Sequence, residues 1–359
     1  MDKTCFEKIP GHVQFVAKYI PYVGGGEVQF LKTADALREL GVEVETAPAS
    51  LRGFPAVVHF FGSHGNLFND YARALKERYR IPYVVSTIFY PSPRGVRNVV
   101  YAGISKFLIR RNLECLIPGK GFRELPYLLR NADMLLPNTA AEAEILKTFF
   151  PFIKDEKIMI VPNGVEDKFE KGDEEVFRCH FKINYDFVLN VARLEPRKNQ
   201  LRLIRALKGT GIKLVIVGNK SVYPDYAREC FNEGGEDVFF AGELSHDDSL
   251  LAGAYAAAKV FALPASEETP GISAMEAALA GAAVVITERG GTKEYYKNYV
   301  KYVDPISVDD IRNKIIAAWE EGANIDGLKN LILANYSWSK VAQITREAYL
   351  KVIGNNNNR

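Results

Sequence analysis

Short apolar runs alternate with longer segments of helical character along most of the 359-residue chain. The short runs are rich in Val, Ile and Phe and are apolar throughout, which is typical of parallel strands that are buried on both faces. Because such strands alternate with helices, the pattern predicts an α/β fold with parallel sheets.

The same pattern predicts where the strands and helices lie. Strands are predicted at His12–Lys18, Ala56–Phe61, Pro82–Thr87, Asp133–Leu136 and Lys157–Val161, and again at Asp186–Val191, Lys213–Val217, Val238–Phe240, Lys259–Leu263 and Ala283–Thr287. Helices are predicted at Glu27–Leu40, Ala140–Phe149, Gln200–Leu207, Ala274–Ala280 and Ser337–Val352. Two such sets predict two doubly wound, Rossmann-like domains, and ligands bind sheets of this kind at the carboxyl ends of the strands.

The charged stretch Glu166–Glu175 has little to bury and is the expected boundary between the domains. We therefore expect an N-terminal domain at 1–170, a C-terminal domain at 171–336, and a closing segment at 337–359. The helix in the closing segment is expected to pack back on the N-terminal domain, and the asparagine-rich tail Asn355–Asn358 to be disordered.

The amino-acid composition argues against several classes of protein. The chain is 47% hydrophobic and 25% charged, which suits two globular cores. Its 46 basic and 44 acidic residues give a net charge of +2, which argues against a dedicated nucleic-acid binder. Four scattered cysteines suggest a reducing cytoplasm rather than a disulfide framework or zinc site. The first residues lack the pattern of a signal peptide, and no apolar run reaches the length of a membrane span.

Two carboxylates flank the start of a predicted helix after the strand Lys259–Leu263. Glu268 lies in the loop ahead of Pro270-Gly271, and Glu276 lies one turn inside the helix. A helix N-terminus offers unpaired amides and a partial positive charge to a diphosphate, and a glycine lets the backbone approach it closely. Two glutamates at this spacing are often mere surface charge, but the strand, the Pro-Gly turn and the small-residue helix around them favour a ligand site.

This segment resembles the E-x7-E signature of the retaining GT-B-fold glycosyltransferases of family GT4, also called group 1. The resemblance implies two domains that face each other across a cleft and transfer of a sugar from a nucleotide-diphosphate sugar. It places Glu268 at the donor sugar and Glu276 at the nucleotide ribose. It also assigns three backbone amides to donor groups: Gly271, Ile272 and Ser273. Thr269-Pro270 departs from the family, where Gly-Phe is common.

The segment Ala192–Lys198 is similar to the G-R-L-x-x-x-K motif of the same family, with Ala192 in place of the glycine. The resemblance implies that Arg193 and Lys198 bind the donor diphosphate. Cations at that point would stabilise the negative charge that grows on a departing diphosphate. Arg197 is interpreted as the solvated start of the next helix.

Two weaker motifs fit the same family. Gly24-Gly25-Gly26 follows the first strand and opens a helix, and it resembles the glycine loop that faces donor and acceptor. It is not a G-x-G-x-x-G pattern, so a dinucleotide-binding site is not supported. Leu244 follows a strand in the second half of the chain, and the resemblance places it at the nucleobase.

The histidines mark a departure from the family. Many members carry a histidine near the donor sugar where this chain has Phe89. His59 and His64 lie at the end of a neighbouring strand and are candidates for a donor or acceptor contact, although a structural role fits each of them equally well. No histidine spacing suggests a metal site, and the resemblance implies that neither a metal nor another cofactor is needed.

The segment Ser92–Arg130 interleaves basic and apolar residues, with only Glu114 and Glu124 as opposing charges. Its basic residues are Arg94, Arg97, Lys106, Arg110, Arg111, Lys120, Arg123 and Arg130. The pattern suits an anionic membrane or a lipid-diphosphate acceptor, and an ordinary helix pair with a solvated face suits it equally well.

The sequence therefore predicts a hexosyltransferase-like enzyme that uses a UDP- or GDP-sugar and a glycan or lipid-linked acceptor. It is expected in the cytoplasm or at the inner face of the membrane, in lipid-linked or cell-surface glycan synthesis. Three alternatives stay open: a GT-B phosphorylase, a sugar-nucleotide epimerase, and a non-catalytic protein that binds nucleotide sugars.

Overall fold

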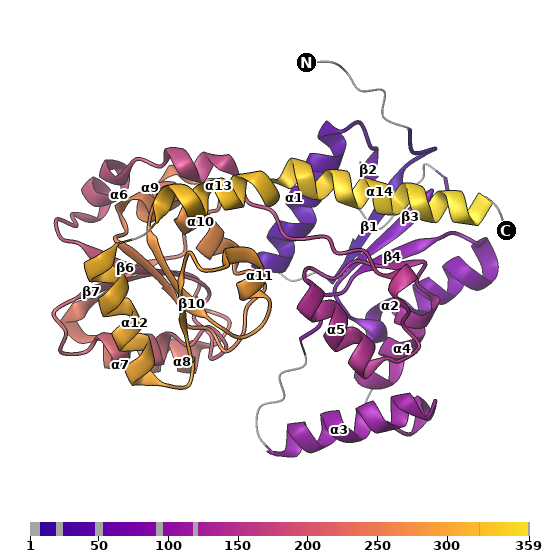
Figure 1. Ribbon diagram of the computed structural model, residues 1–359, viewed down its shortest axis with the longest axis horizontal. Coiled ribbons are helices and arrows are strands. Elements are labelled where there is room, and N and C mark those ends of the chain that lie inside the picture. Colours follow the sequence, from indigo (N-terminus) through magenta and orange to yellow (C-terminus); the bar gives the residue numbers. More distant parts are fainter. Residues whose placement is uncertain are drawn as a thin grey trace. The chain divides into compact units, whose positions relative to one another are not determined.

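A computed structural model describes residues 8–18, 24–46, 53–90, 96–117, 121–322 and 324–357. The chain divides into two compact units (Figure 1). Unit 1 comprises Met1–Asn163 with Trp338–Arg359, and unit 2 comprises Gly164–Ser337. The division thus falls just before the charged stretch Glu166–Glu175, which lies in unit 2.

The described part of unit 1 contains a five-stranded parallel sheet in the order β2-β1-β3-β4-β5. Its strands are β1 (Val13–Ala17), β2 (Val44–Glu45), β3 (Val57–Phe61), β4 (Tyr83–Ser86) and β5 (Met134–Leu135). Every residue of β3 and β4 is buried, which explains why these strands read as continuous apolar runs.

One predicted strand of this unit is wrong. Residues Lys157–Val161 form no strand, and Ile158 makes only an isolated bridge to Leu135. Pro162 follows directly and has no N–H to extend a ladder, which limits the pairing. Conversely, β2 was not predicted, because two residues are too short to show a periodicity.

Helices cover both faces of this sheet. They are α1 (Gly25–Glu39), α2 (Gly65–Arg73), α3 (Val96–Arg110), α4 (Gly121–Asn131), α5 (Ala140–Phe149) and α14 (Trp338–Asn357). The last helix packs against α1, and its Val341, Ala342 and Tyr349 belong to the same core as the strand β1. The expected disorder of the asparagine tail is wrong as far as Asn357, because α14 continues to that residue.

The sheet of unit 2 has six parallel strands among the described residues, in the order β11-β10-β9-β6-β7-β8. The strands are β6 (Phe187–Val191), β7 (Lys213–Val217), β8 (Val238–Gly242), β9 (Val260–Leu263), β10 (Ala283–Thr287) and β11 (Lys301–Val303). From β6 the chain runs outward through β7 and β8, then returns to β9 on the other side of β6. A switch of this kind opens a crevice at the carboxyl ends of β6 and β9, where ligands bind in such sheets.

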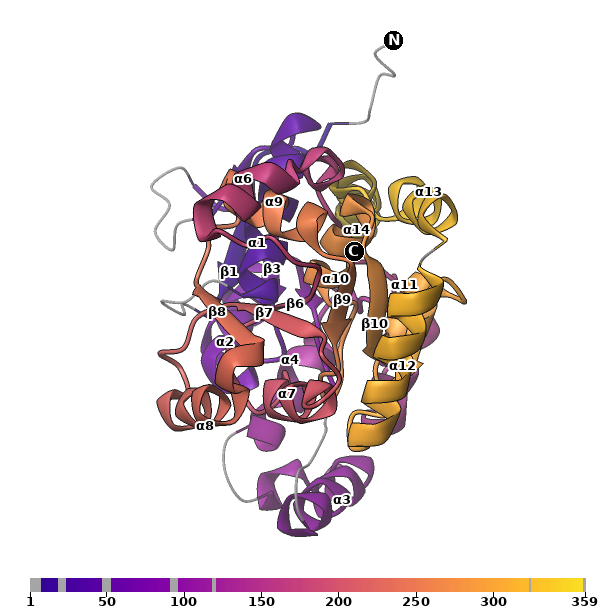
Figure 2. The same ribbon diagram turned by 90° about the vertical axis from the view of Figure 1, so that its left-hand side faces the viewer.

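The helices of unit 2 lie on two sides of its sheet (Figure 2). One face packs against α7 (Gln200–Leu207), α8 (Pro224–Gly234) and α12 (Val308–Glu321). The other packs against α6 (Glu174–Phe181), α9 (Ser249–Ala257), α10 (Ile272–Ala280) and α13 (Ile325–Asn335). The short helix α11 (Thr292–Tyr296) follows β10. No helix in the described part of the chain is long and apolar enough to cross a membrane.

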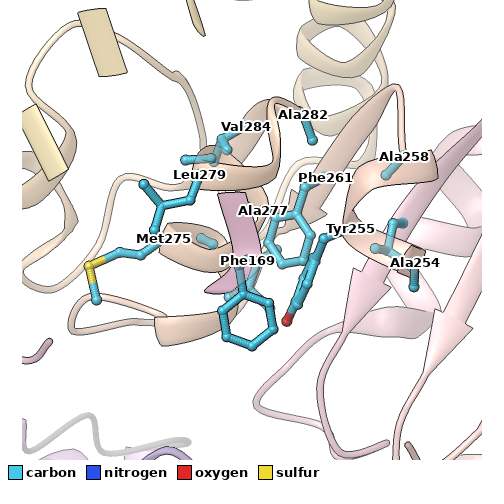
Figure 3. Close-up of a cluster of buried hydrophobic side chains, with 14 of the residues drawn as sticks. Phe169, Ala254, Tyr255, Ala258, Phe261, Met275, Ala277, Leu279, Ala282 and Val284 are labelled. Atoms are coloured by element: carbon cyan, nitrogen blue, oxygen red, sulfur yellow. The ribbon is translucent and has the colours of Figure 1, made fainter. Parts of the chain in front are cut away.

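The core beneath α10 is built from small residues and a few large rings (Figure 3). Ala277 and other alanines let α10 approach its neighbours closely, and Tyr255 of α9 lies beside Phe169 and Phe261. The ring centroids of Tyr255 and Phe169 are 5.5 Å apart at 89°, an edge-to-face contact that favours one arrangement of the rings. This packing holds Tyr255 next to the second turn of α10.

Candidate active site at the ends of β6 and β9

The crevice of unit 2 brings together the loops that follow β6 and β9. Arg193 and Lys198 lie in the first loop, and Glu268 lies in the second. The backbone N–H of Ser266 donates to the carbonyl of Arg197 at 2.8 Å, which joins the two loops directly. These loops thus bring together charged residues that the sequence separates by 70 positions.

Glu268 is the centre of a buried charge cluster. Lys198 Nζ donates to Oε1 of Glu268, and Arg197 Nη1 lies 3.5 Å from the same oxygen. The exposed fraction of Glu268 is only 6%. Burial favours the neutral acid, but Lys198 and Arg197 outweigh it and hold the pKa of Glu268 below its usual value. The side chain is therefore a carboxylate at neutral pH.

Arg197 is exposed, in line with its interpretation as a solvated side chain, and it also contacts this cluster. Its Nε lies 3.3 Å from Oε1 of Glu195, while Nη2 of Arg193 lies 3.6 Å from the other oxygen of Glu195. Glu195 is itself buried. Three cations are thus held by two buried carboxylates at the end of β6, which is a dense positive site for an anionic ligand.

Asn199 fixes the loop that carries these cations. It has a φ of 65° ahead of α7, and its Nδ2 donates to the carbonyls of Pro264 and Pro305 at 2.8 and 2.7 Å. Asparagine tolerates this left-handed conformation better than most residues. The two hydrogen bonds tie the loop after β6 to the loops after β9 and β11, so the backbone next to Lys198 is rigidly supported.

The N-terminus of α10 opens beside this cluster. Gly271 precedes the helix with a φ of 77°, and a Cβ there would lie 3.0 Å from Leu263 Cδ2. Glycine is therefore required by both backbone and packing. No side chain caps the helix, so the first amides, those of Ile272 and Ser273, are available to an anion. Both residues are half-buried.

Glu276 lies in the second turn of α10 and is held by two partners that the sequence did not suggest. Tyr255 donates its hydroxyl to Oε2 at 2.6 Å, and His246 Nε2 lies 2.8 Å from Oε1. The other ring nitrogen of His246 lies 3.3 Å from Glu166 Oε2. The exposed fraction of Glu276 is 3%. Each carboxylate oxygen keeps a second lone pair, so Glu276 can still accept a hydrogen bond from a ligand hydroxyl.

A cavity of about 370 Å³ lies next to the charge cluster, at the ends of β7 and β8. It is lined by Leu194, Ile216, Gly218, Asn219, Lys220, Ser221, Phe231, Phe240, Gly242 and Glu243. Leu244, which was predicted at a nucleobase, is absent from this lining and packs half-buried on the core of unit 2. The polar loop after β7 was not identified from the sequence.

The glycine motif of unit 1 is described from Gly24 onward, since residues 19–23 lie outside the described part. Gly25 and Gly26 form the first turn of α1, and neither has a positive φ. A Cβ at Gly26 would meet no heavy atom of the described residues within 4 Å. The first turn of α1 therefore carries no side chain at Gly25 or Gly26.

His59 has the geometry of a structural residue. It is fully buried in β3, with Nδ1 at 2.7 Å from the Tyr349 hydroxyl and Nε2 at 2.9 Å from Ser86 Oγ. Burial lowers the pKa of His59 to about 3, so the ring is neutral. His64 precedes α2 and is half-buried, and its pKa is lowered by burial and by Lys18. Of the two candidates, only His64 has an accessible surface.

Phe89 is buried in the core of unit 1. Its ring packs edge-on against Phe149, and its backbone N–H donates to Glu142 Oε1 at 2.7 Å. The side chain that stands where family members carry a histidine therefore contributes to packing.

One group of described side chains has the spacing of metal ligands: Glu166, His246 and Asp247. The ammonium of Lys168 lies 3.1 Å from Glu166 and 2.8 Å from Asp247. A lysine already supplies positive charge at this point, and Asp247 is exposed, so the group has the character of a surface ion-pair network.

Residues 173–335 match the family model described as glycosyl transferases group 1. The match lies within unit 2 and includes the charge cluster, the N-terminus of α10 and Glu276.

Two relatives are similar over part of the chain. The chain is 28% identical over 236 residues to the lipopolysaccharide 1,2-N-acetylglucosaminetransferase of Salmonella typhimurium, covering 58% of this chain and 61% of the relative. It is 30% identical over 214 residues to an uncharacterised glycosyltransferase of Methanocaldococcus jannaschii, covering 54% of each chain. The chain thus spans less than two thirds of the relatives it matches.

Solved structures resemble the whole chain. The Anabaena protein HepE, crystallised in complex with UDP and glucose, has a TM-score of 0.71 at 16% identity, covering 95% of this chain and 100% of that one. The likeness extends over both units and concerns the fold. The chain therefore has the GT-B fold, and its second unit matches the glycosyl transferases of group 1.

Proposed function

We propose that this protein is a retaining, hexosyltransferase-like glycosyltransferase of the GT4 type, which takes its sugar from a nucleotide-diphosphate sugar. The observation that carries the proposal is the charge cluster, in which Lys198 and Arg197 contact buried Glu268 beside the uncapped N-terminus of α10. A cationic site next to free helix amides suits a diphosphate. The family match of residues 173–335 supports the same activity.

The donor is a UDP- or GDP-sugar in this proposal. The cavity at the ends of β7 and β8 has room for a nucleobase, and we assign Glu276 to the ribose. The similar Anabaena structure contains UDP and glucose, and the Salmonella relative is named for N-acetylglucosamine. A UDP-hexose is accordingly the first donor to test.

The cations act on the leaving group. Arg193, Lys198 and the first amides of α10 bind the diphosphate, and each charge-assisted hydrogen bond contributes about 1.5–3 kcal/mol. As the bond from the anomeric carbon to the diphosphate breaks, negative charge grows on the departing oxygens, so these groups stabilise the transition state more than the ground state. Lysine has three donors, so Lys198 can bind phosphate while it stays paired with Glu268.

Retention requires the acceptor oxygen to bond to the face that the diphosphate leaves. The transition state is oxocarbenium-like, Glu268 contacts the donor sugar, and the acceptor proton passes to the departing phosphate oxygen. The protein groups supply all the positive charge, so no metal or other cofactor takes part.

The acceptor in this proposal is a glycan or a lipid-linked sugar, in lipid-linked or cell-surface glycan synthesis. The protein acts in the cytoplasm or peripherally at the inner face of the membrane.

A panel of UDP- and GDP-sugars tests the proposal. Thermal shift identifies the donor that stabilises the protein, and its turnover is then followed with and without EDTA. We expect donor cleavage that EDTA leaves unchanged, and a product with the anomeric configuration of the donor by NMR. Tight nucleotide binding without turnover of any donor would instead indicate a non-catalytic binding protein. Phosphate-dependent cleavage would indicate a phosphorylase.

A further inference from the structure

Helix α3 has two apolar faces on opposite sides. Ala102, Ser105 and Ile109 are buried against the rest of unit 1. Val100, Ile104 and Phe107 are 52%, 51% and 57% exposed. These two sets are each spaced three and four residues apart and are half a turn out of phase, so they lie on opposite sides of the helix. We call the outer set the α3 stripe.

Further apolar side chains are exposed after the end of the helix. Leu113 is 41% exposed and Leu116 is 62% exposed, and exposed Cys115 lies between them. In Figure 1, α3 lies at the edge of unit 1, with α4 and α5 between it and the sheet. A clustered apolar surface of this kind marks an interaction site, whereas single exposed apolar residues are common.

Basic side chains lie next to the α3 stripe. Helix α3 contains no acidic residue. Arg111 follows Phe107 on the same side and places its guanidinium 5.4 Å from the ring centroid. Glu114, the nearest acid in the sequence, is 19% exposed and lies 3.1 Å from Arg130, so its charge is compensated. Arg130 is thereby engaged internally, and among the described side chains of the segment Arg110 and Arg111 are exposed cations near the end of α3.

We propose that the α3 stripe inserts into the surface of a bilayer that contains anionic phospholipids. Apolar side chains flanked by arginines match the interface of such a bilayer, because the rings and aliphatic groups enter the acyl boundary while the guanidinium groups reach the phosphates. The positive charge beside the α3 stripe favours an anionic bilayer over a second copy of the chain, because the stripe of a second copy would carry the same positive charge. The proposal needs only α3 and phospholipid, so it is independent of the sugar transfer.

Flotation of the full chain with vesicles of phosphatidylcholine, with or without about one third phosphatidylglycerol, tests this proposal. We expect binding only to the anionic vesicles, and weaker binding as salt rises. Arg110→Gln/Arg111→Gln should weaken binding roughly 10- to 30-fold, since each basic residue near an anionic surface contributes about 1 kcal/mol. Arg110 also donates to the Thr148 carbonyl at 3.3 Å, so Arg111→Gln alone serves as the milder variant.

The stripe itself is tested by Ile104→Ser/Phe107→Ser, which should abolish binding while circular dichroism stays unchanged. Ile306→Ser is the matched control, because Ile306 is 62% exposed in unit 2, outside the stripe. If the double variant does not fold, Phe107→Ser alone replaces it. Binding by the stripe variants as strong as by the control would overturn the proposal. So would self-association that depends on Phe107 in the absence of vesicle binding.

Cys115 gives an independent readout of insertion. A polarity-sensitive dye on Cys115, with the other cysteines replaced by serine, should shift to the blue with anionic vesicles. The same dye on Cys179, which is exposed on α6 of unit 2, should not shift. Equal shifts at both positions would indicate nonspecific adsorption and contradict the role of α3.

Discussion

His246 Nε2 lies 2.8 Å from one oxygen of Glu276, and the Tyr255 hydroxyl donates to the other oxygen at 2.6 Å. The carboxylate is therefore oriented from both sides before any ligand arrives. A carboxylate that is already oriented loses less conformational freedom when a ligand binds to it, which increases the affinity for that ligand. We therefore expect His246 and Tyr255 to increase the affinity for the nucleotide by orienting the carboxylate of Glu276.

Tyr255→Phe and His246→Ala should weaken binding of the preferred nucleotide diphosphate roughly 10- to 100-fold, because a hydrogen bond to a charged group contributes about 1.5–3 kcal/mol. If Glu276 contacts the ribose, the variants should bind the 2′,3′-dideoxy nucleotide as well as the parent protein does. Isothermal titration with both nucleotides measures this difference.

Tyr302→Phe is the control for this prediction, because its hydroxyl donates to the Lys297 carbonyl and does not contact Glu276. An equal loss of affinity for the ribo- and dideoxy nucleotides would mean that the variants disturb the site generally, and the link between Glu276 and the ribose would fail.

Glu268→Gln should reduce both stability and activity. The change leaves Lys198, whose side chain is only 15% exposed, without its carboxylate. Breaking a buried ion pair by removing one partner typically costs about 3–5 kcal/mol. Urea unfolding of unit 2, followed through Trp319 in a Trp338→Phe background, should show a loss of this order.

The double variant Glu268→Gln/Lys198→Met separates folding from catalysis. Removing both charges should restore most of the stability, because no unpaired buried charge from this pair remains. Donor cleavage should stay at least 100-fold reduced, since two groups assigned to the donor are gone. Full activity in the restored double variant would exclude the charge pair from the reaction.

Gly271→Ala should destabilise unit 2 by about 1–3 kcal/mol, because alanine adopts a φ of 77° only with strain and its Cβ would press on Leu263. Gly26→Ala is the matched variant at another helix start, where a side chain meets no neighbour. It should keep or slightly raise stability, since alanine favours helices. Chemical unfolding distinguishes the two, and similar losses in both would contradict the strain and the Leu263 contact assigned to Gly271.

Some of the fold could be predicted because buried parallel strands are continuous apolar runs. Lys213–Val217 and Ala283–Thr287 were predicted with the bounds that the structure shows. The strands β2 and β11 were missed, since two and three residues carry no clear pattern. In the same way, the false strand at Lys157–Val161 has the residues of a strand but pairs only through the isolated bridge of Ile158 to Leu135, and such pairing depends on tertiary structure.

The candidate site was likewise predicted only in part, because some of its residues depend on tertiary packing. Glu268 and Lys198 were singled out because each follows a strand in a segment that resembles a family motif, and chain order places such residues at one edge of the sheet. His246 and Tyr255 were missed because they lie 30 and 21 residues before Glu276, on a loop and a helix whose packing is not visible in the sequence. The contacts of exposed Arg197 with Glu195 and Glu268 were not predicted, because they depend on how the two loops pack together.

His59 should make unit 1 less stable as the pH falls. Its pKa in the folded protein is lowered by burial to about 3, whereas an exposed histidine has a pKa of 6.5. Above pH 6.5 the ring is neutral in both states, and its hydrogen bonds to Tyr349 and Ser86 contribute fully. Between pH 6.5 and 3 the unfolded chain binds a proton that the folded state excludes, so the free energy of unfolding falls by about 1 kcal/mol per pH unit.

Urea unfolding between pH 7 and 4 measures this slope, with Trp338 at the start of α14 as the reporter in a Trp319→Phe background. His59→Phe should be less stable at pH 7, because the hydroxyls of Tyr349 and Ser86 lose a buried partner, and its stability should depend less on pH. His180→Gln, on the surface of α6 in unit 2, should leave the slope of unit 1 unchanged. An identical slope in His59→Phe and the parent protein would mean that other groups cause the acid sensitivity of this unit.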